Sequence, residues 1–270
     1  ALNRLVSCKM PILPSEGFCL YRPTCSASDA LGVGVNSIFA IIRKIMQVMV
    51  PSTIKLSGLF LALKRVFYRH LISHDAIYDS RYYATDVEGP AASSAPDISH
   101  SITSDLQPHT VVDVGCGTGA LLEVLKDNGC QVFGLEYSEA AIQFCRDRGV
   151  DVQKFDLEKE ALAIDQTFDV AVSMEVGEHL PEKSADRYVE ILAKLSDTIV
   201  FSAAQPGPRE RHAHDHVNER PKPYWLSKFR SLGFEYDEIM SEKWRGKWQA
   251  DGTWKYHVDI WNSSMPMPAQ

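Results

Sequence analysis

The chain has 270 residues, of which 45% are hydrophobic, and its formal net charge is −7. This length suits one large α/β domain with a modest extension. The lack of an uncharged apolar run of about eighteen residues argues against a transmembrane helix. The acidic balance argues against a nucleic-acid backbone as the main partner.

The charge is unevenly distributed along the chain. Residues 1–74 carry nine Lys/Arg and two Asp/Glu, whereas the remainder carries nineteen and thirty-three. Residues 1–30 show no periodicity, and residues 35–50 and 53–73 have helical apolar spacing. A basic, apolar front is typical of a packed helical cap, which we favour, of a targeting segment, or of peripheral membrane contact through residues 35–74.

We divide the chain into three parts. Residues 1–50 are an N-terminal extension that is partly irregular, residues 51–104 are a helical cap and linker, and residues 105–270 are the main domain. We expect the linker at Glu88–Asp97, because its sequence EGPAASSAPD has the composition of a loop.

The six cysteines include no Cys-x-x-Cys pair. We therefore expect a reduced, cytoplasmic chain without a zinc site. The spacing of His212, His214 and His216 would suit a metal only on a strand, and nearby prolines predict a loop there instead. Our prediction is that the chain binds no metal.

Strands and helices alternate from about residue 105. The predicted strands cover residues 110–114, 132–135, 152–155, 168–173, 198–202, 234–239 and 256–261. The predicted helices cover residues 120–128, 139–148, 184–195 and 224–232. Short connections between them predict a parallel, doubly wound sheet with helices on both faces.

The first predicted strand ends in a glycine-rich turn, where Gly115, Gly117 and Gly119 follow Asp113. In such sheets ligands bind at the carboxyl ends of the strands, and glycine lets a ligand approach the backbone closely. With Ala120 the turn also satisfies the dinucleotide pattern G-x-G-x-x-G/A. Two kinds of ligand therefore fit the turn: a dinucleotide, and a ligand that carries an ammonium and a sulfonium. Asp113 favours the second, because a carboxylate suits these cations better than it suits a pyrophosphate.

Acidic residues also follow the next strands. Glu136 can take two ribose hydroxyls of either ligand. Asp156 can accept from an adenine amino group while Leu157 covers the ring. Glu175 and Val176 follow the fourth strand. The structural alternatives for these positions are a solvated strand end, a turn, or a simple strand-to-helix loop.

Four segments resemble successive motifs of the class I S-adenosylmethionine-dependent methyltransferases: VVDVGCGTG, GLEYS, KFDLE and FDVAVSMEVGEHLP. They occur in the family's order, each at the end of a predicted strand. The resemblance implies an α/β, Rossmann-like, doubly wound seven-stranded sheet of order 3-2-1-4-5-7-6, with the last strand antiparallel and an N-terminal helical extension. It identifies residues 105–270 as the methyltransferase domain and S-adenosyl-L-methionine as the cofactor. The cofactor-binding residues that it implies are Asp113, Gly115, Cys116, Gly117, Gly119, Glu136, Tyr137, Ser138, Asp156, Leu157, Glu175 and Val176.

A second resemblance concerns His214–Phe234, which is similar to the segment after the fifth strand in a bacterial and viral-type subgroup of these enzymes. An oxygen acceptor must lose a proton during methyl transfer, and histidine is a suitable base near neutral pH. We hypothesise that His179 or His216 is this base and that Glu178 orients it. In the alternative, His179 holds its loop, and His216 is solvated or bonds to the backbone.

Aromatic residues near the predicted site have two interpretations. Four tryptophans either line an acceptor pocket or pack in the core: Trp225, Trp244, Trp248 and Trp254. Tyr82 or Tyr83 either covers the cofactor, as an N-terminal lid does in such methyltransferases, or packs in the core.

The sequence thus predicts a methyltransferase that acts on a small or medium-sized acceptor molecule, with O-methylation slightly favoured. A nucleic-acid substrate is disfavoured, because the fourth strand lacks the Asn/Asp-Pro-Pro-Tyr/Phe signature of enzymes that methylate base amino groups. The alternatives are a NAD-dependent oxidoreductase and a non-catalytic cofactor-binding adaptor.

Overall fold

The computed structural model describes residues 78–206, 216–251 and 258–263. Its strands are β1 (Thr110–Val114), β2 (Gln131–Glu136), β3 (Val152–Lys154), β4 (Val170–Met174), β5 (Thr198–Ser202), β6 (Phe234–Tyr236) and β7 (Asp259–Ser263). Its α-helices are α5 (Ser80–Tyr82), α6 (Glu88–Asp105), α7 (Ala120–Asp127), α8 (Glu139–Asp147), α9 (Ala185–Leu195), α10 (Lys222–Ser231) and α11 (Glu238–Asp251). A π-helical turn, η1 (Tyr83–Val87), joins α5 to α6, and a 3₁₀ turn, η2 (Glu182–Ser184), precedes α9.

The seven strands form one sheet of order β3-β2-β1-β4-β5-β7-β6. Strands β1 to β5 pair in parallel, and β7 is antiparallel to both β5 and β6. The predicted strand order and the antiparallel last strand are therefore confirmed. Val112 of β1 pairs with Phe133 of β2 and Ala171 of β4, so these three strands end at the same edge of the sheet.

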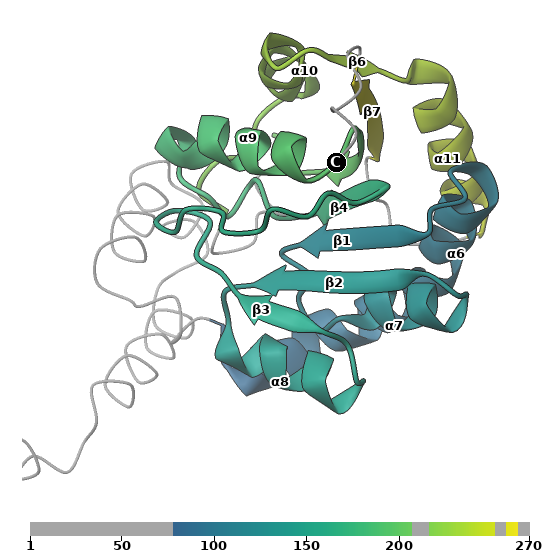
Figure 1. The fold of residues 1–270 in the computed structure, drawn as a ribbon, viewed down its shortest axis with the longest axis vertical. Helices are drawn as coiled ribbons and strands as arrows, with labels where there is room; N and C mark the ends of the chain where they lie inside the picture. The colour runs from purple at the N-terminus through teal and green to yellow at the C-terminus, as the bar shows by residue number, and fades with distance from the viewer. Residues whose placement is uncertain (1–77, 207–215, 252–257, 264–270) are drawn as a thin grey trace, which may run out of the picture. The chain divides into compact units, whose positions relative to one another are not determined.

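Helices cover both faces of this sheet (Figure 1). Successive strand residues point to opposite faces, and the buried residues of β1 divide accordingly. Val112 and Val114 pack in a cluster with residues of α9 and α10. Val111 packs in a second cluster with residues of α6, α7 and α11. The loops at the strand ends are thus held by a core on each side.

The predicted linker at Glu88–Asp97 was wrong, because these residues form the first half of helix α6. Pro90 lies shortly after the π-helical turn η1, with which α6 is continuous. Pro96 lies inside the helix, but Ile98 and Ile102 on the same helix are buried in the core. Packing therefore overrides a composition that resembles a loop.

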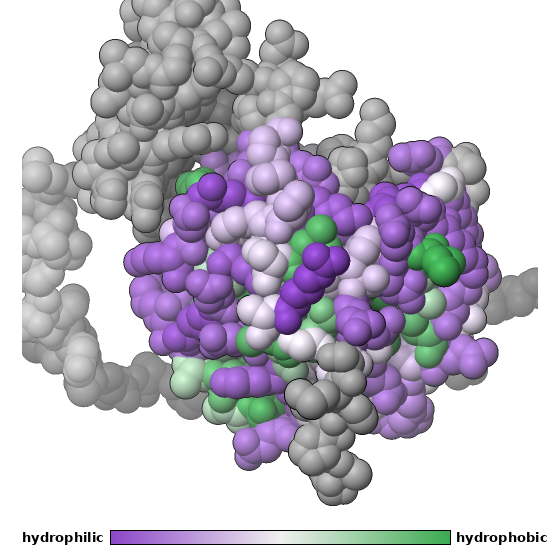
Figure 2. All heavy atoms as spheres, turned by 90° about the horizontal axis from the view of Figure 1, so that it is seen from above, coloured by the Kyte–Doolittle hydropathy of each residue, from purple (hydrophilic) through white to green (hydrophobic). Residues whose placement is uncertain are grey.

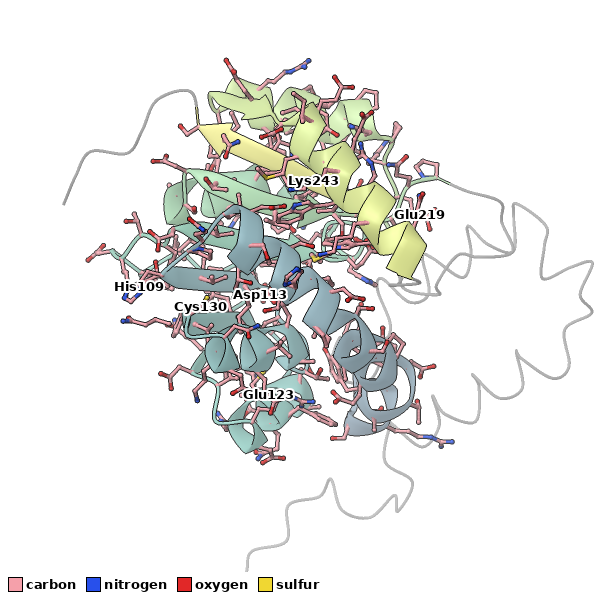
Figure 3. The ribbon with its side chains drawn as sticks, turned by 90° about the vertical axis from the view of Figure 1, so that its right-hand side faces the viewer. His109, Asp113, Glu123, Cys130, Glu219 and Lys243 are labelled. Carbon is pink, nitrogen blue, oxygen red and sulfur yellow. The ribbon has the colours of Figure 1, made fainter. Side chains whose placement is uncertain are left out.

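The strand predicted at residues 234–239 is shorter in the structure. It ends at Tyr236, and helix α11 begins at Glu238. Trp244 and Trp248 lie four residues apart, hence on one helix face, and both are fully buried. The indole nitrogen of Trp244 donates to the Asp105 carboxylate at 2.7 Å, and that of Trp248 donates to the Ser101 hydroxyl at 3.0 Å. Figure 3 shows α11 beside α6, which supplies both acceptors. These two tryptophans are core residues, and the pocket interpretation was wrong for them.

Several predictions fall outside the described residues: the helices at 35–50 and 53–73, the membrane contact through 35–74, and the roles of His212, His214 and Trp254. Among the helices that the structure describes, none combines the length and apolar character needed to span a bilayer. The face in Figure 2 is mainly hydrophilic, with apolar residues in small groups. The large apolar side chains exposed in the described part are Leu232 and Ile239.

Candidate active site

The glycine turn after β1 lies against the end of β2. Gly115 donates its N–H to the Leu135 carbonyl at 2.7 Å, and Gly117 donates to the Glu136 carboxylate at 2.9 Å. Gly115, Gly117 and Gly119 all have positive φ, at 80°, 55° and 75°. A Cβ on Gly115 would also lie 2.5 Å from a Val176 methyl group. The turn therefore requires glycine at Gly115 for both backbone conformation and space.

Two carboxyl groups are buried beside this turn. Burial, and to a lesser extent the nearby Glu136 charge, raise the pKa of Asp113 to about 8. Burial also raises the pKa of Glu136, although hydrogen bonds from the Ser138 and Gly117 N–H groups oppose the shift. Desolvation favours the neutral form of a carboxyl group, so a cationic ligand would restore the charge on Asp113.

An aromatic segment from the N-terminal side contacts the strand ends. The Tyr78 carbonyl accepts a hydrogen bond from the Ser138 hydroxyl at 3.0 Å, and the Tyr78 hydroxyl lies 3.1 Å from Nδ1 of His179. The Tyr78 and Tyr82 rings meet edge to face at 5.4 Å, and Tyr83 is buried. The sequence analysis proposed Tyr82 or Tyr83 for a lid and missed Tyr78, although the cluster YDSRYY contains all three.

The end of β3 has a more local structure. One carboxylate oxygen of Asp156 accepts from the Glu158 N–H at 2.9 Å, and the other accepts from the Lys159 ammonium at 3.0 Å. Asp156 therefore starts a turn, which was the alternative to adenine recognition. Leu157 packs against the buried core, and the Lys154 ammonium lies 5.9 Å from the centre of the Tyr137 ring.

The loop after β4 is strained at its first residue. Glu175 has φ 58°, which is uncommon for a residue with a side chain. Its N–H donates to the Ser202 carbonyl at 3.1 Å, and its carboxylate accepts from the Ser202 hydroxyl at 2.8 Å. Hydrogen bonds to β5 therefore hold Glu175 in this conformation. Two residues later, a Cβ on Gly177 would lie 2.8 Å from the buried Trp225 ring, so Trp225 supports the loop from within the core.

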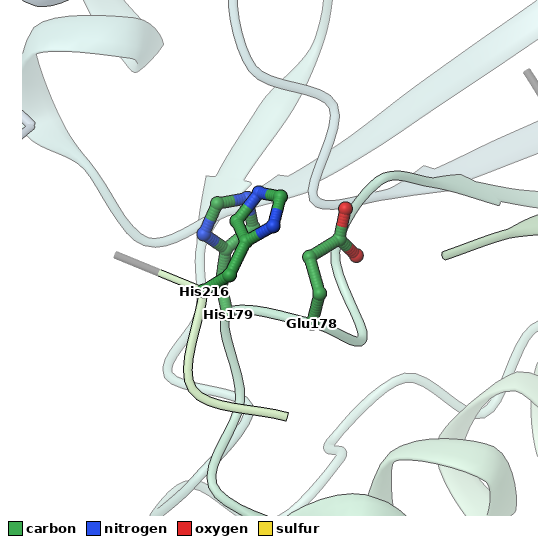
Figure 4. A group of neighbouring side chains, drawn as sticks. All are labelled: Glu178, His179 and His216. Atoms are coloured by element: carbon green, nitrogen blue, oxygen red, sulfur yellow. The ribbon is translucent and has the colours of Figure 1, made fainter. Parts of the chain in front are cut away.

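The three predicted catalytic residues lie together beyond this strained residue (Figure 4). One ligand atom from each of Glu178, His179 and His216 lies within 4.8 Å of the others. The two imidazole rings meet edge to face with centroids 4.8 Å apart. The carbonyl of Glu178 accepts hydrogen bonds from the N–H groups of Val217 and Asn218, at 2.8 and 3.0 Å. This backbone connection brings His216 to the end of β4.

The environments of these side chains differ. Glu178 is fully buried, and neither of its carboxylate oxygens has a hydrogen-bond partner among the described residues. Burial, together with the nearby Glu175 charge, raises its pKa to about 8. His216 is half-buried, and its Nδ1 lies 2.9 Å from the Glu219 carboxylate. The group thus contains an unsatisfied buried carboxyl and two imidazoles.

The model of the methyltransferase domain family matches residues 112–195, from the middle of β1 to the end of α9. This range contains the glycine turn, Glu136 and the loop after β4. This part of the chain belongs to the methyltransferase domain family, and the resemblance to the class I S-adenosylmethionine-dependent methyltransferases is confirmed. Its cofactor is S-adenosylmethionine.

Two curated relatives of this methyltransferase are ubiquinone biosynthesis O-methyltransferases. That of Stutzerimonas stutzeri is 30% identical over 133 residues, covering 47% of this chain and 50% of the relative. That of Methylococcus capsulatus is 38% identical over 110 residues, covering 36% and 46%. The chain therefore matches about half the length of these relatives.

Solved structures show the same fold. A TehB-like S-adenosylmethionine-dependent methyltransferase from Corynebacterium glutamicum aligns with a TM-score of 0.52 and 16% identity, covering 68% of this chain and 98% of that one. Magnesium protoporphyrin IX methyltransferase from Synechocystis, solved with bound SAH, aligns with a TM-score of 0.51 and 14% identity, covering 84% and 100%.

The glycine turn generates a stability prediction. Gly115→Ala should lower the free energy of unfolding by about 2–4 kcal/mol, because it combines left-handed backbone strain with a collision against Val176. Gly129→Ala is the matched control, since Gly129 has φ 93° but open space around it, and should cost about 1 kcal/mol. Urea unfolding of both variants measures the difference. A double-mutant cycle of Gly115→Ala with Val176→Ala should show coupling of about 1 kcal/mol; equal losses in the two glycine variants and no coupling would contradict the collision.

Proposed function

We propose that this methyltransferase transfers the methyl group of S-adenosylmethionine to a hydroxyl group of a small or medium-sized acceptor. The observation that carries the proposal is the adjacency of two groups at one sheet edge. Buried carboxyls flank the glycine turn after β1, and the Glu178–His179–His216 group lies at the end of β4, which pairs directly with β1. The O-methyltransferase activity named for the curated relatives supports a hydroxyl acceptor.

The cofactor is proposed to lie over the glycine turn. Asp113 would bind its ammonium group, because a buried carboxylate gains most from a cationic partner. Glu136 would accept from the two ribose hydroxyls. Asp156, which already accepts from the Glu158 N–H and the Lys159 ammonium, would accept in addition from the adenine amino group, with Leu157 against the ring. Val176, which touches the turn at Gly115, would limit the space beside the cofactor. Cys116, Gly117, Gly119, Tyr137, Ser138 and Glu175 would complete the binding surface.

Methyl transfer is then an in-line displacement. An oxygen lone pair of the acceptor forms a bond to the methyl carbon, and the carbon–sulfur bond breaks. Its electron pair stays on sulfur, which changes from a sulfonium to a neutral thioether. The hydroxyl proton leaves to a base in the Glu178–His179–His216 group and then to solvent. Alignment of the three reacting atoms supplies much of the rate enhancement, and proton removal supplies more.

Ligand binding separates this proposal from a NAD-dependent oxidoreductase. S-adenosylhomocysteine, the demethylated product, should bind the purified chain in calorimetry, and NADH should not. The Asp113→Asn variant should lose at least about tenfold in affinity for S-adenosylhomocysteine because the ammonium loses its counter-charge. Binding of NADH without S-adenosylhomocysteine would overturn the proposed function.

The raised pKa of Asp113 makes this binding depend on pH. Below about pH 8 the free carboxyl is mainly protonated, whereas the bound ammonium favours the carboxylate, so binding releases a proton. Affinity should therefore fall by up to about tenfold per pH unit below 8 and level off above it. Calorimetry at pH 7 in buffers of different ionisation enthalpy measures the proton release. The Asp113→Asn variant is the control, because a proton that it releases on binding cannot come from residue 113. Equal proton release by the two proteins would show that Asp113 stays neutral.

The catalytic group can be tested by turnover. His179→Ala and His216→Ala should each reduce transfer of a labelled methyl group to a panel of phenols and catechols by more than about tenfold. Their affinity for S-adenosylhomocysteine should change little. His109→Ala is the control, because His109 precedes β1 at Thr110, at the amino end of that strand. If neither active-site variant loses tenfold, the catalytic assignment of the histidines is wrong.

A further inference from the structure

Two cysteine side chains meet beside the glycine turn. Cys116 belongs to the turn itself, Cys145 lies on α8, and their Sγ atoms are 3.9 Å apart. Both residues are free cysteines, of which Cys116 is half-buried and Cys145 is fully buried. A small reagent that enters the site therefore reaches Cys116 first, and Cys145 only through it.

Two glycines leave the space that these sulfur atoms occupy. A Cβ on Gly119 would lie 2.8 Å from the Cys145 sulfur, and a Cβ on Gly134 would lie 2.7 Å from the Cys116 sulfur. Gly134 lies within β2, where glycine weakens a strand and often marks the close approach of another group. The fold thus makes room for a pair of thiols at this position.

From this arrangement we propose that Cys116 and Cys145 are a redox modification site, which a hydroperoxide joins into a reversible disulfide that distorts the glycine turn. A disulfide bond is about 2.05 Å long. The two sulfur atoms, now 3.9 Å apart, must therefore approach each other by about 2 Å. The site differs from the proposed catalytic group, because it lies between the β1 turn and α8.

The reaction consumes one hydroperoxide for each disulfide. The Cys116 sulfur attacks the outer peroxide oxygen, the O–O bond breaks, and an alcohol or water leaves with the thiol proton, so that Cys116 becomes a sulfenic acid. The Cys145 sulfur then attacks the Cys116 sulfur, the S–O bond breaks, and water leaves with the second thiol proton. A small thiol reverses the link by exchange and is itself oxidised to a disulfide.

The surroundings of Cys116 slow the first step near neutral pH. The hydrogen bond with Cys145 and burial, followed by the charges of Cys145, Glu136 and Asp113, raise the pKa of the Cys116 thiol well above its usual value. Tyr83 on η1 also faces Cys116, but burial raises the pKa of Tyr83, which stays neutral. Because the thiolate is the reactive form, oxidation at a fixed hydroperoxide concentration should become faster as the pH rises.

The strain of the link falls on the turn and not on the helix. Cys145 lies on α8 with the buried Ala141 and Ile142, whereas the turn is a loop between β1 and α7. Gly117 in this turn accepts from the Cys145 thiol at 3.3 Å and donates its N–H to the Glu136 carboxylate at 2.9 Å. The disulfide removes the thiol proton of the first bond and pulls on the residue that precedes Gly117.

The effect on cofactor binding rests on the proposed function, in which the cofactor lies over this turn and Glu136 accepts from its ribose. Losing the Gly117 hydrogen bond releases Glu136 from its position, so the oxidised chain should bind S-adenosylhomocysteine at least about tenfold more weakly than the reduced chain. By linkage, the ligand favours the two thiols by the same factor. Saturating S-adenosylhomocysteine should therefore raise the reduction potential of the pair by at least about 30 mV, the equivalent of tenfold for two electrons.

Peptide mapping and calorimetry test the site on the full chain. The reduced chain is treated with hydrogen peroxide, its remaining thiols are blocked, and a protease digest is searched by mass spectrometry for peptides joined through Cys116 and Cys145. We expect this cross-linked pair, the loss of S-adenosylhomocysteine affinity, and reversal of both by dithiothreitol. The reduction potential is measured in dithiothreitol redox buffers with and without S-adenosylhomocysteine.

Two variants make the test specific. Cys145→Ser should form no cross-link and should keep its S-adenosylhomocysteine affinity through the peroxide treatment. Cys130→Ser is the matched control, because Cys130 is also buried but its thiol donates to the Pro108 carbonyl at 3.5 Å. It should cross-link and lose affinity as the wild type does.

Several outcomes would overturn the site. The first is the absence of the cross-linked pair from peroxide-treated wild type, and the second is an equal loss of affinity in Cys145→Ser, with Cys145→Ala in its place if the serine variant fails to fold. A cross-link that leaves both the affinity and the reduction potential unchanged would overturn the distortion of the turn. If the reduced wild type does not bind S-adenosylhomocysteine, the proposed function is wrong, whereas the peptide map still decides whether the disulfide forms.

Discussion

The parallel pairing of β1 with β2 on one side and with β4 on the other is the constraint on which the site depends. Parallel strands in register end at the same edge, so the residues that follow them must share a small space. The glycine turn after β1 fills part of it with backbone alone, and Val176 from the β4 loop occupies the space that a Cβ at Gly115 would need. The proposed cofactor side and the proposed acceptor side of the site are therefore adjacent.

This edge gathers acidic groups that the fold does not neutralise. Burial raises the pKa of Asp113, Glu136 and Glu178. A buried carboxyl with a raised pKa is a cost in the absence of a partner, and such groups are concentrated at functional sites because ligands supply the missing charge. An ammonium beside Asp113 would supply it. This physical argument thus supports the proposed function.

The sequence predicted the central sheet well, because glycines and capping residues separate short apolar strands from amphipathic helices. It failed where tertiary packing decides. Helix α6 begins with a segment rich in Pro, Ser and Ala, and its helical state depends on burial of Ile98 and Ile102. Helix α11 depends on Trp244 and Trp248, whose partners Asp105 and Ser101 lie more than a hundred residues earlier. No local pattern contains that information.

The proposed catalytic group was likewise predictable only in part. His179 could be located from the sequence because it directly follows a recognisable strand. The position of His216 beside it depends on two hydrogen bonds from the next segment to the Glu178 carbonyl, and backbone acceptors carry no sequence signal. These bonds involve main-chain atoms alone, whereas the His216 ring also lies 2.9 Å from the Glu219 carboxylate.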